Sequence, residues 1–194
     1  MTDVETAAEA VRRGDLIVYP TETVYGLGAD ALDPAAVERV FEAKGRDRAD
    51  PVSLAVPTVE RAFEYVDANE REKRFMREFL PGPFTVVVPR RPVVPDVLTA
   101  GRTRVGVRVP DHPLARRLLE TVAPITATSA NVSGRPSVTA IGDLDQAIRD
   151  AVAVVLDGGE TPGTASTVVD VEARDVIREG AEAGRVRDWL EAQG

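Results

Sequence analysis

Residues 16–28 read LIVYPTETVYGLG, and the rest of the chain is most easily understood outward from this stretch. Its first four residues are apolar or aromatic, which is typical of a buried strand, and Pro20 ends that strand. The connection that follows brings hydroxyls, a carboxylate, a phenol and two glycines to one strand end. Such a loop can hold a small polar substrate, although turns rich in threonine and glycine are also common after strands. It is not a phosphate P-loop, because the Gly-Lys-Ser/Thr ending is missing.

Apolar strands and amphipathic helices alternate on both sides of this stretch. The pattern predicts helices at 2–13, 34–43, 59–66, 70–80, 111–120 (capped by Asp111), 144–150 and 186–193, and further strands at 52–56, 84–88, 104–109, 125–128, 152–156, 167–171 and 176–178. Because strands also follow one another near the C-terminus, we expect a mixed sheet with helices on its faces. Alternation along 104–109 places Arg104 and Arg108 on one face. The acidic residues of the 70–80 helix, Glu70, Glu72 and Glu78, are expected to form a solvated face.

Composition excludes several classes of site. The chain has 194 residues, no cysteine and one histidine, His112, so disulfides, Cys-ligated metals and multi-histidine metal sites are ruled out. A Ser-His-Asp triad would have to use His112, which at a helix start is typically a capping or surface residue. The length predicts a single domain over 1–194.

The charge balance and hydropathy bear on partners and location. Asp and Glu exceed Lys and Arg by 32 to 24, so the net charge is −8, which argues against general nucleic-acid binding but leaves room for a local basic cavity. No apolar run approaches the roughly 18 residues of a membrane span, and the acidic start is unlike a signal peptide. We therefore expect a cytoplasmic protein with no membrane partner.

Three segments carry candidate binding residues. Lys44 and Arg46 flank a glycine after a helix, which suits a polyphosphate, although cations at a helix C-terminus can also act as caps. The loop at 129–136, SANVSGRP, offers hydroxyl and amide groups for a ribose or phosphate, or is simply a polar loop. Arg108 lies in a strand of valines and glycine, so its guanidinium needs an anion. A substrate carboxylate and an internal aspartate are the two candidates.

Taken together, these segments resemble the YrdC/TsaC family of threonylcarbamoyl-AMP synthases. The matches are YPTETVYGLG at 19–28, KGR at 44–46 with DP at 50–51, PGPFT at 81–85, VRVPDHP at 107–113, SANVSGRPS at 129–137, DGG at 157–159 and STVVD at 166–170. They run in order across most of the chain and contain the K-x-R and S-x-N pairs of the family signature. The chain resembles the single-domain form of the family.

The resemblance implies a fold and a reaction. The fold is a three-layer YrdC-like α/β domain, with a twisted mixed β-sheet flanked by helices around a basic cavity. The reaction is that of a nucleotidyltransferase: L-threonine, bicarbonate and ATP give threonylcarbamoyl-AMP and pyrophosphate, with Mg²⁺ expected on the phosphates and no protein-ligated metal. A partner transferase complex would then use the adenylate to modify tRNA. No step needs a protein nucleophile, so positioning and charge neutralisation can suffice.

Site residues carry over from the resemblance position by position. The implied catalytic residues are Lys44 and Arg46, facing ATP phosphates. The implied ATP set is completed by Asp50, Ser129, Asn131, Thr139 and Arg178, and the implied threonine set is Thr23, Arg108, Ser129 and Ser166. The chain departs from the common family pattern at Asp47, Asp50, Ala55, Arg104 and Thr128.

Two other functions compete with the synthase. One is an RNA-binding module, for double-stranded RNA, tRNA or ribosome assembly, that uses the basic cavity without turnover. The second is a carbamoyl-transfer protein related to domains inside hydrogenase-maturation proteins. Those proteins are much longer multidomain chains, so the length of 194 residues argues against this alternative. The pairing of Thr23 with Arg108 disfavours a pure RNA binder.

The choice of basic residues gives the first testable prediction. Only Lys44 and Lys73 are lysines, and the other 22 of the 24 basic residues are arginines. Acid excess with little lysine is the pattern of adaptation to high salt; a GC-rich genome also favours arginine. If the protein is halophilic, dialysis from high to low salt should lower its urea midpoint of unfolding. An unchanged midpoint would favour the genomic explanation.

Overall fold

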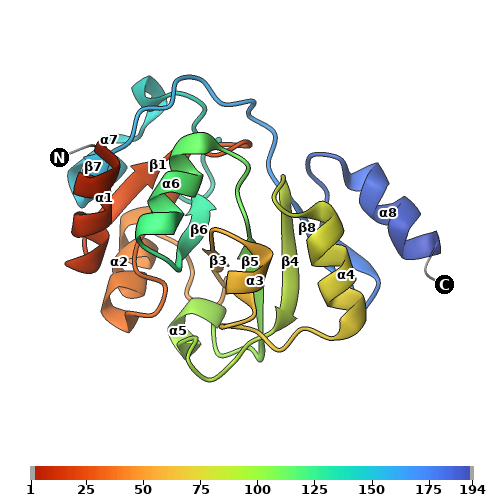
Figure 1. Ribbon diagram of the computed structural model, residues 1–194. Helices are drawn as coiled ribbons and strands as arrows, with labels where there is room; N and C mark the ends of the chain where they lie inside the picture. Colours follow the sequence, from red (N-terminus) through yellow and green to blue (C-terminus); the bar gives the residue numbers. More distant parts are fainter. Residues whose placement is uncertain (1–2, 193–194) are drawn as a thin grey trace.

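The computed structural model describes residues 3–192, which form a mixed sheet of nine strands flanked by helices (Figure 1). The strand order is β7-β1-β2-β6-β3-β5-β4-β8-β9, with parallel and antiparallel neighbours. The strands are β1 (Leu16–Tyr19), β2 (Gly26–Gly28), β3 (Ser53–Ala55), β4 (Phe84–Pro89), β5 (Arg104–Arg108), β6 (Ile125–Ser129), β7 (Val152–Val155), β8 (Thr167–Asp170) and β9 (Asp175–Arg178). The expected mixed α/β fold is confirmed.

The helices lie, with one exception, at the predicted places, with shifted ends. They are α1 (Asp3–Arg12), α2 (Pro34–Lys44), α3 (Val59–Ala62), α4 (Glu70–Phe79), α5 (Asp96–Thr99), α6 (Pro113–Thr121), α7 (Gln146–Ala151) and α8 (Ala183–Ala192), with a 3₁₀ turn, η1, at Ile141–Asp143. The expected ends at Thr2 and Gln193 lie outside the described residues. Within residues 3–192, no helix combines the length and the apolarity that a membrane crossing requires.

Strand β1 is buried on both faces. Ile17 and Tyr19 pack into a cluster with α1 and α6, whereas Leu16 and Val18 pack into a second cluster with α2 and α7. This double burial explains why 16–19 carries no polar residue. The helices α1 and α6 therefore cover one face of this half of the sheet, and α2 and α7 cover the other (Figure 1).

The other half of the sheet is packed on one face only. Val105 and Val107 of β5 join the largest core cluster, together with side chains of α4 and α8. The alternate residues Arg104, Gly106 and Arg108 line a cavity on the opposite face. Because side chains alternate along a strand, the predicted common face of Arg104 and Arg108 is confirmed, and it is the face that bounds the cavity.

Strand β2 is absent from the sequence predictions, and its glycines explain both its presence and the omission. A Cβ atom at Gly26 would lie 2.9 Å from Cζ of Tyr19, and one at Gly28 would lie 3.0 Å from Cγ1 of Ile17. The glycines thus make room for the β1 side chains on the neighbouring strand. A three-residue strand with two glycines has little strand propensity of its own. The short helix α5 is likewise not predicted.

Three further expectations are wrong. His112, rather than Asp111, caps α6, since its Nδ1 accepts from the amide of Leu114. The helix expected over 59–66 ends at Ala62. Glu72 is fully buried instead of solvated: its carboxylate accepts from Arg104 Nη2 at 2.7 Å and from the amide of Asn69 at 2.8 Å.

The buried Glu72 carboxylate ties α4 to β5 and closes a capping box with Asn69. Glu72→Ala should therefore lower the free energy of unfolding by about 2–4 kcal/mol, because it removes a buried charge-assisted hydrogen bond and a helix cap. Urea titration followed by circular dichroism measures the effect. Glu70→Ala in the same helical turn is the control, and it should cause no comparable loss, since the Glu70 side chain is 86% exposed. Equal losses would contradict a special role for Glu72.

Candidate functional site

A cavity of about 590 Å³ lies over the open face of β3, β5, β4 and β8. Residues from the 19–26 stretch, the turn after α2, the end of β6 and the strands β8 and β9 complete its walls. Seven of the residues predicted to bind substrate line it: Thr23, Arg46, Asp50, Arg108, Ser129, Ser166 and Arg178. The fold therefore brings together groups separated by up to 155 positions in the sequence, as 178 − 23 gives.

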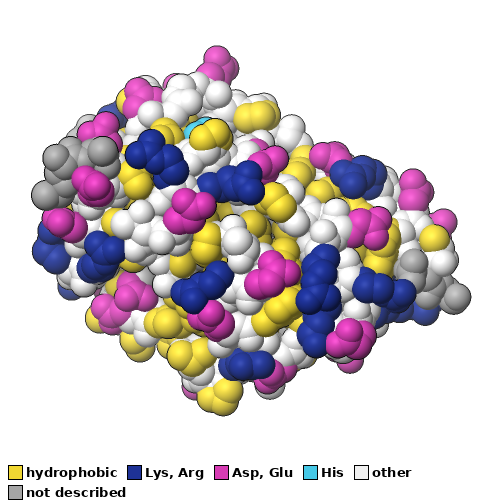
Figure 2. Space-filling view, viewed as in Figure 1, with side chains coloured by type: hydrophobic (Ala, Val, Ile, Leu, Met, Phe, Trp, Pro, Cys, Tyr) yellow, Lys and Arg dark blue, Asp and Glu magenta, His cyan; other side chains and the backbone are white. Residues whose placement is uncertain are grey.

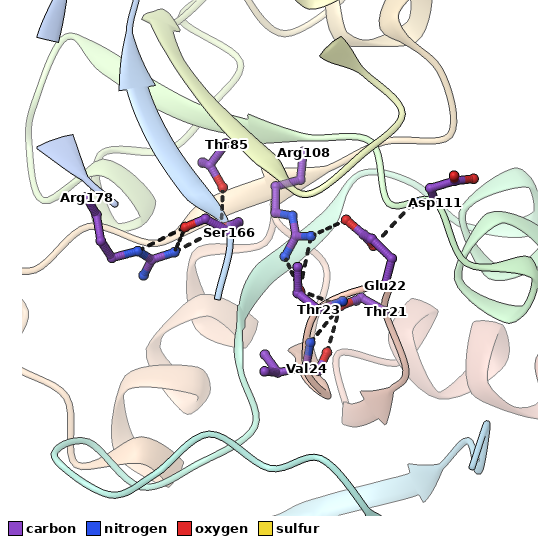
Figure 3. A network of polar contacts seen from close by, with 9 residues as sticks. All are labelled: Thr21, Glu22, Thr23, Val24, Thr85, Arg108, Asp111, Ser166 and Arg178. Carbon is purple, nitrogen blue, oxygen red and sulfur yellow. Dashed lines mark hydrogen bonds and ion pairs between the residues drawn. The ribbon is translucent and has the colours of Figure 1, made fainter. Parts of the chain in front are cut away.

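Arg108 is the centre of a buried polar network (Figure 3). Its Nη2 lies 2.5 Å from Glu22 Oε1, and both Nη1 and Nη2 lie 3.3 Å from the hydroxyl of Thr23. The anion that this guanidinium requires is thus Glu22, and not an aspartate. The Nε of Arg108 is buried and has no hydrogen-bond acceptor among residues 3–192.

The hydroxyls below Arg108 form an ordered chain. Thr21 donates to the carbonyl of Val24 at 2.7 Å, and its hydroxyl lies 2.9 Å from that of Thr23. Because Thr21 has one proton and spends it on Val24, Thr23 donates to Thr21 and accepts from Arg108. The Thr-Glu-Thr segment thereby fixes the direction of each hydrogen bond around the guanidinium.

Ser166 and Arg178 form a second group on the facing wall (Figure 3). Arg178 Nη2 lies 2.9 Å from both the hydroxyl and the carbonyl oxygen of Ser166, and the Ser166 hydroxyl lies 3.0 Å from that of Thr85. Burial lowers the pKa of Arg178, and the nearby charges of Arg108 and Arg46 lower it further. Three cations therefore act on one another across this cavity, which favours an anionic ligand.

Arg46 reaches the cavity from the turn after α2. Its Nε donates to the carbonyl of Asp50 at 3.1 Å, and its Nη2 donates to the carbonyl of Pro51 at 3.0 Å. These acceptors are neutral, so they orient the guanidinium without forming an ion pair with it. Gly45 adopts a left-handed conformation, with φ of 55°, that ends α2 and directs the chain into this turn.

Lys44 lies behind the cavity wall rather than on it. Its side chain is buried, and its Nζ donates to the carbonyls of Ser129 and Asn131, the latter at 2.6 Å. The Lys44 carbonyl in turn accepts from the amide of Ser133. Lys44 therefore fastens the end of α2 to the loop after β6. Burial lowers its pKa to about 8, with a further contribution from the charge of Arg46.

Asn131 and Thr139 also lie outside the cavity lining. The amide of Asn131 donates to the carbonyls of Val132 and Arg135, which folds the loop. In the part of the chain that the structure describes, no donor reaches its buried Oδ1. The carbonyl of Thr139 accepts from the amide of Thr161 at 2.8 Å. That Lys44, Asn131 and Thr139 contact a nucleotide stays a prediction.

Sequence reasoning gives no role to several residues that the structure places in or beside the site. Glu22 and Thr85 hold Arg108 and Ser166, and both occur in motifs quoted above, TET and PGPFT, but nothing in a strand pattern says which side chain meets which partner. The phenol of Tyr25 does not face the cavity: it donates to the carbonyl of Gly159 at 2.7 Å and accepts from the amide of Gly158, which orders the DGG turn.

The far end of the cavity has a different balance of charge. Arg104 is paired there with Glu72, Asp170 and Glu172. Its charge is therefore offset, whereas Arg46 and Arg178 are held by carbonyl and hydroxyl oxygens. Within residues 3–192, no group of three or more His, Cys, Asp or Glu side chains is arranged to hold a metal ion.

A mixed α/β domain whose open sheet face carries arginines and hydroxyls has the side-chain chemistry that suits an anion. Sequence comparison defines the group further: residues 9–180 match the Sua5/YciO/YrdC family, which has the description "Telomere recombination". The match covers most of the chain, and the chain belongs to this family.

Three relatives illustrate the likeness. The threonylcarbamoyl-AMP synthase of Pyrococcus abyssi is 42% identical over 171 residues, which are 87% of this chain and 50% of that protein. A putative threonylcarbamoyl-AMP synthase of Methanocaldococcus jannaschii is 32% identical, over 91% of this chain and 85% of that protein. The crystal structure of P. abyssi Sua5 complexed with L-threonine has a TM-score of 0.86 and 37% identity, and covers 96% of this chain and 58% of that one. The chain thus spans about half the length of the Pyrococcus relative.

The burial of Lys44 predicts an unusual titration. A Lys73→Arg variant leaves Lys44 as the one lysine of the sequence, so a lysine-specific ¹⁵N label reports it alone. Its midpoint should lie near pH 8. The folded pKa lies below the ordinary 10.5, so between about pH 8 and 10.5 the unfolded chain holds a proton that the folded chain lacks. The free energy of unfolding should therefore rise with pH across this window relative to Lys44→Met. A midpoint above pH 10 would contradict the assignment.

Proposed function

We propose that the chain is a threonylcarbamoyl-AMP synthase, which converts L-threonine, bicarbonate and ATP into threonylcarbamoyl-AMP, pyrophosphate and water. Support comes from the family membership, from the names of its relatives and from the cavity. The observation that carries the proposal is one cavity with two kinds of cationic site. Arg108 is a buried guanidinium with an unused donor and suits one carboxylate, while Arg46 and Arg178 carry charges that suit a polyphosphate.

The proposed chemistry needs orientation and charge more than reactive side chains. The amine of threonine attacks the carbon of CO₂ and loses a proton, or attacks bicarbonate, whose hydroxyl leaves with an amine proton as water. Either route gives a carbamate. A carbamate oxygen then attacks the α-phosphorus of ATP, and the bond to pyrophosphate breaks. Both reactants are anions in the second step, so cations that neutralise them lower its barrier. This step makes the proposed enzyme a nucleotidyltransferase.

The residues divide between the substrates. Arg108, with Thr23 and Ser166, holds threonine through its carboxylate. Arg46 and Arg178 bind the ATP phosphates, and Ser129 lies between the two substrates. Lys44 is proposed to act on the phosphates from the end of α2, where it is bonded to the loop after β6. Asp50, Asn131 and Thr139 are proposed to lie on the nucleotide side. The donor set of the cavity does not fit a resident metal, so Mg²⁺ would enter as part of the ATP complex.

The wider setting is also a proposal. The proposal takes residues 1–194 to form one catalytic domain, which works in the cytoplasm, where ATP and tRNA are found. A tRNA-modifying transferase complex would consume the adenylate, since a mixed anhydride in water must be used quickly. The RNA-binding alternative is less well supported, because a buried carboxylate receptor such as Arg108 has no use in binding a phosphate backbone.

One assay tests the proposed function directly. Purified protein is incubated with ATP, bicarbonate and labelled L-threonine, and pyrophosphate and the labelled adenylate are measured over a range of salt concentrations. The proposal expects pyrophosphate release that depends on threonine. Tight RNA binding without any adenylate at any salt concentration would favour the competing RNA-binding function.

The cations near the phosphates should dominate the rate. Lys44→Ala and Arg46→Ala should each lower kcat/KM by about 100-fold or more, the scale for removing a charge that stabilises a transition state. Arg48→Ala is the matched control and should leave the rate unchanged, since Arg48 pairs with Glu38 and its side chain is 59% exposed. Near-normal rates for the first two variants would show that the phosphates bind elsewhere.

A further inference from the structure

Glu22 has a position that the proposed chemistry leaves unexplained. It lies between Thr21 and Thr23, which both line the cavity, yet Glu22 itself is not a lining residue. Its side chain is 14% exposed, and that of Arg108 is 11% exposed. The carboxylate lies outside the cavity lining, on the other side of Arg108 from Ser166 (Figure 3).

Glu22 is itself held at both oxygens. Oε1 accepts from Arg108 Nη2 at 2.5 Å, and Oε2 accepts from the backbone amide of Asp111 at 3.2 Å. The Asp111 amide belongs to the turn that joins β5 to α6. The Glu22 carboxylate therefore connects its own loop, Thr21-Glu22-Thr23, to the end of β5 (Figure 3). A carboxylate fixed by a backbone donor is a rigid anchor for the guanidinium that it pairs with.

The anchor leaves Arg108 with an unused donor. Both N–H groups of Nη2 are used, on Glu22 and Thr23, and one of the two N–H groups of Nη1 donates to Thr23. Nε is buried and has no acceptor within residues 3–192. A buried N–H without a partner costs free energy, so an oxygen brought to this edge of the guanidinium would satisfy it.

We propose that Glu22 is a positioning residue, which holds the guanidinium of Arg108 in place to receive the carboxylate of the amino-acid substrate. The identity of that ligand rests on the proposed function. That Glu22 positions Arg108 rests only on the contacts of Glu22 with Arg108 and with the Asp111 amide. Glu22 also offsets one of the positive charges that Arg46, Arg108 and Arg178 bring together, which lets them gather before an anion is bound.

Two variants separate the hydrogen bond that Glu22 makes with Arg108 from the negative charge of Glu22. Glu22→Ala removes both, whereas Glu22→Gln keeps one amide oxygen that can accept from Arg108 but loses the charge and the second oxygen, which accepts from the Asp111 amide. Glu70→Gln removes an exposed carboxylate and is the matched control. Thermal unfolding of each variant shows that it folds.

The first measurement is the crystal structure of the ligand-free Glu22→Ala protein. We expect the Arg108 guanidinium to leave its contacts with Thr23. An unchanged Arg108 would overturn the proposal, whatever the protein binds.

The second measurement compares L-threonine with L-threoninamide, which lacks the carboxylate, by calorimetry. Glu22→Ala should weaken threonine binding by about 10-fold or more, the scale of a hydrogen bond to a charged group, with Glu22→Gln between it and wild type. Threoninamide binding should not change, so the ratio of the two affinities should fall. General loosening of the fold would weaken both ligands equally and would overturn the proposal, as would tighter threonine binding, which would make Glu22 a competitor of the substrate. If wild-type protein binds no threonine and makes no adenylate, the proposed function fails, while the crystal structure still decides whether Glu22 holds Arg108.

Discussion

The alternation of side chains along β5 is the constraint on which the cavity depends. Val105 and Val107 pack into the core with α4 and α8, so their neighbours Arg104, Gly106 and Arg108 must face the other way. Gly106 also permits close packing at the centre of this surface, since a Cβ atom there would lie 2.2 Å from Ser53 Oγ and 2.9 Å from Thr85 Cγ2. A shift of one residue in β5 would exchange the core face and the cavity face completely.

The acceptors that hold each arginine set the charge pattern of the cavity. Arg104 meets three carboxylates and Arg108 meets one, so their charges are partly or wholly offset. Arg46 and Arg178 meet carbonyl and hydroxyl oxygens, which orient a guanidinium without neutralising it. The cavity therefore grades from a balanced end at Arg104 to a positive end at Arg46 and Arg178. A chain of net charge −8 can carry such a positive end. The face shown in Figure 2 has cationic and acidic side chains interspersed, while the cavity has its own cations.

Local patterns predict the elements of this fold but not their partners. The apolar run at 16–19 and the alternation of side chains along 104–109 can each be recognised as a strand from the sequence. Burial of Glu72 could not be predicted, because an acidic helix face looks solvated until a cation from a distant strand, Arg104, is placed against it. The same holds for the site. The sequence indicates Arg108 as a cation in need of an anion, yet Glu22 lies 86 residues away and is identified only once β1 and β5 are placed in one sheet.

The use of lysine at position 44 follows from the geometry around it. A compact ammonium has three donors that point to different sides, and the Lys44 ammonium donates to two carbonyls two residues apart in the loop, those of Ser129 and Asn131. A planar guanidinium is larger and would force the loop away from α2. Arginine replaces lysine readily on an exposed surface, which needs charge alone. A chain that uses arginine for nearly all its other cations therefore keeps lysine where the loop beside the cavity is fastened to α2.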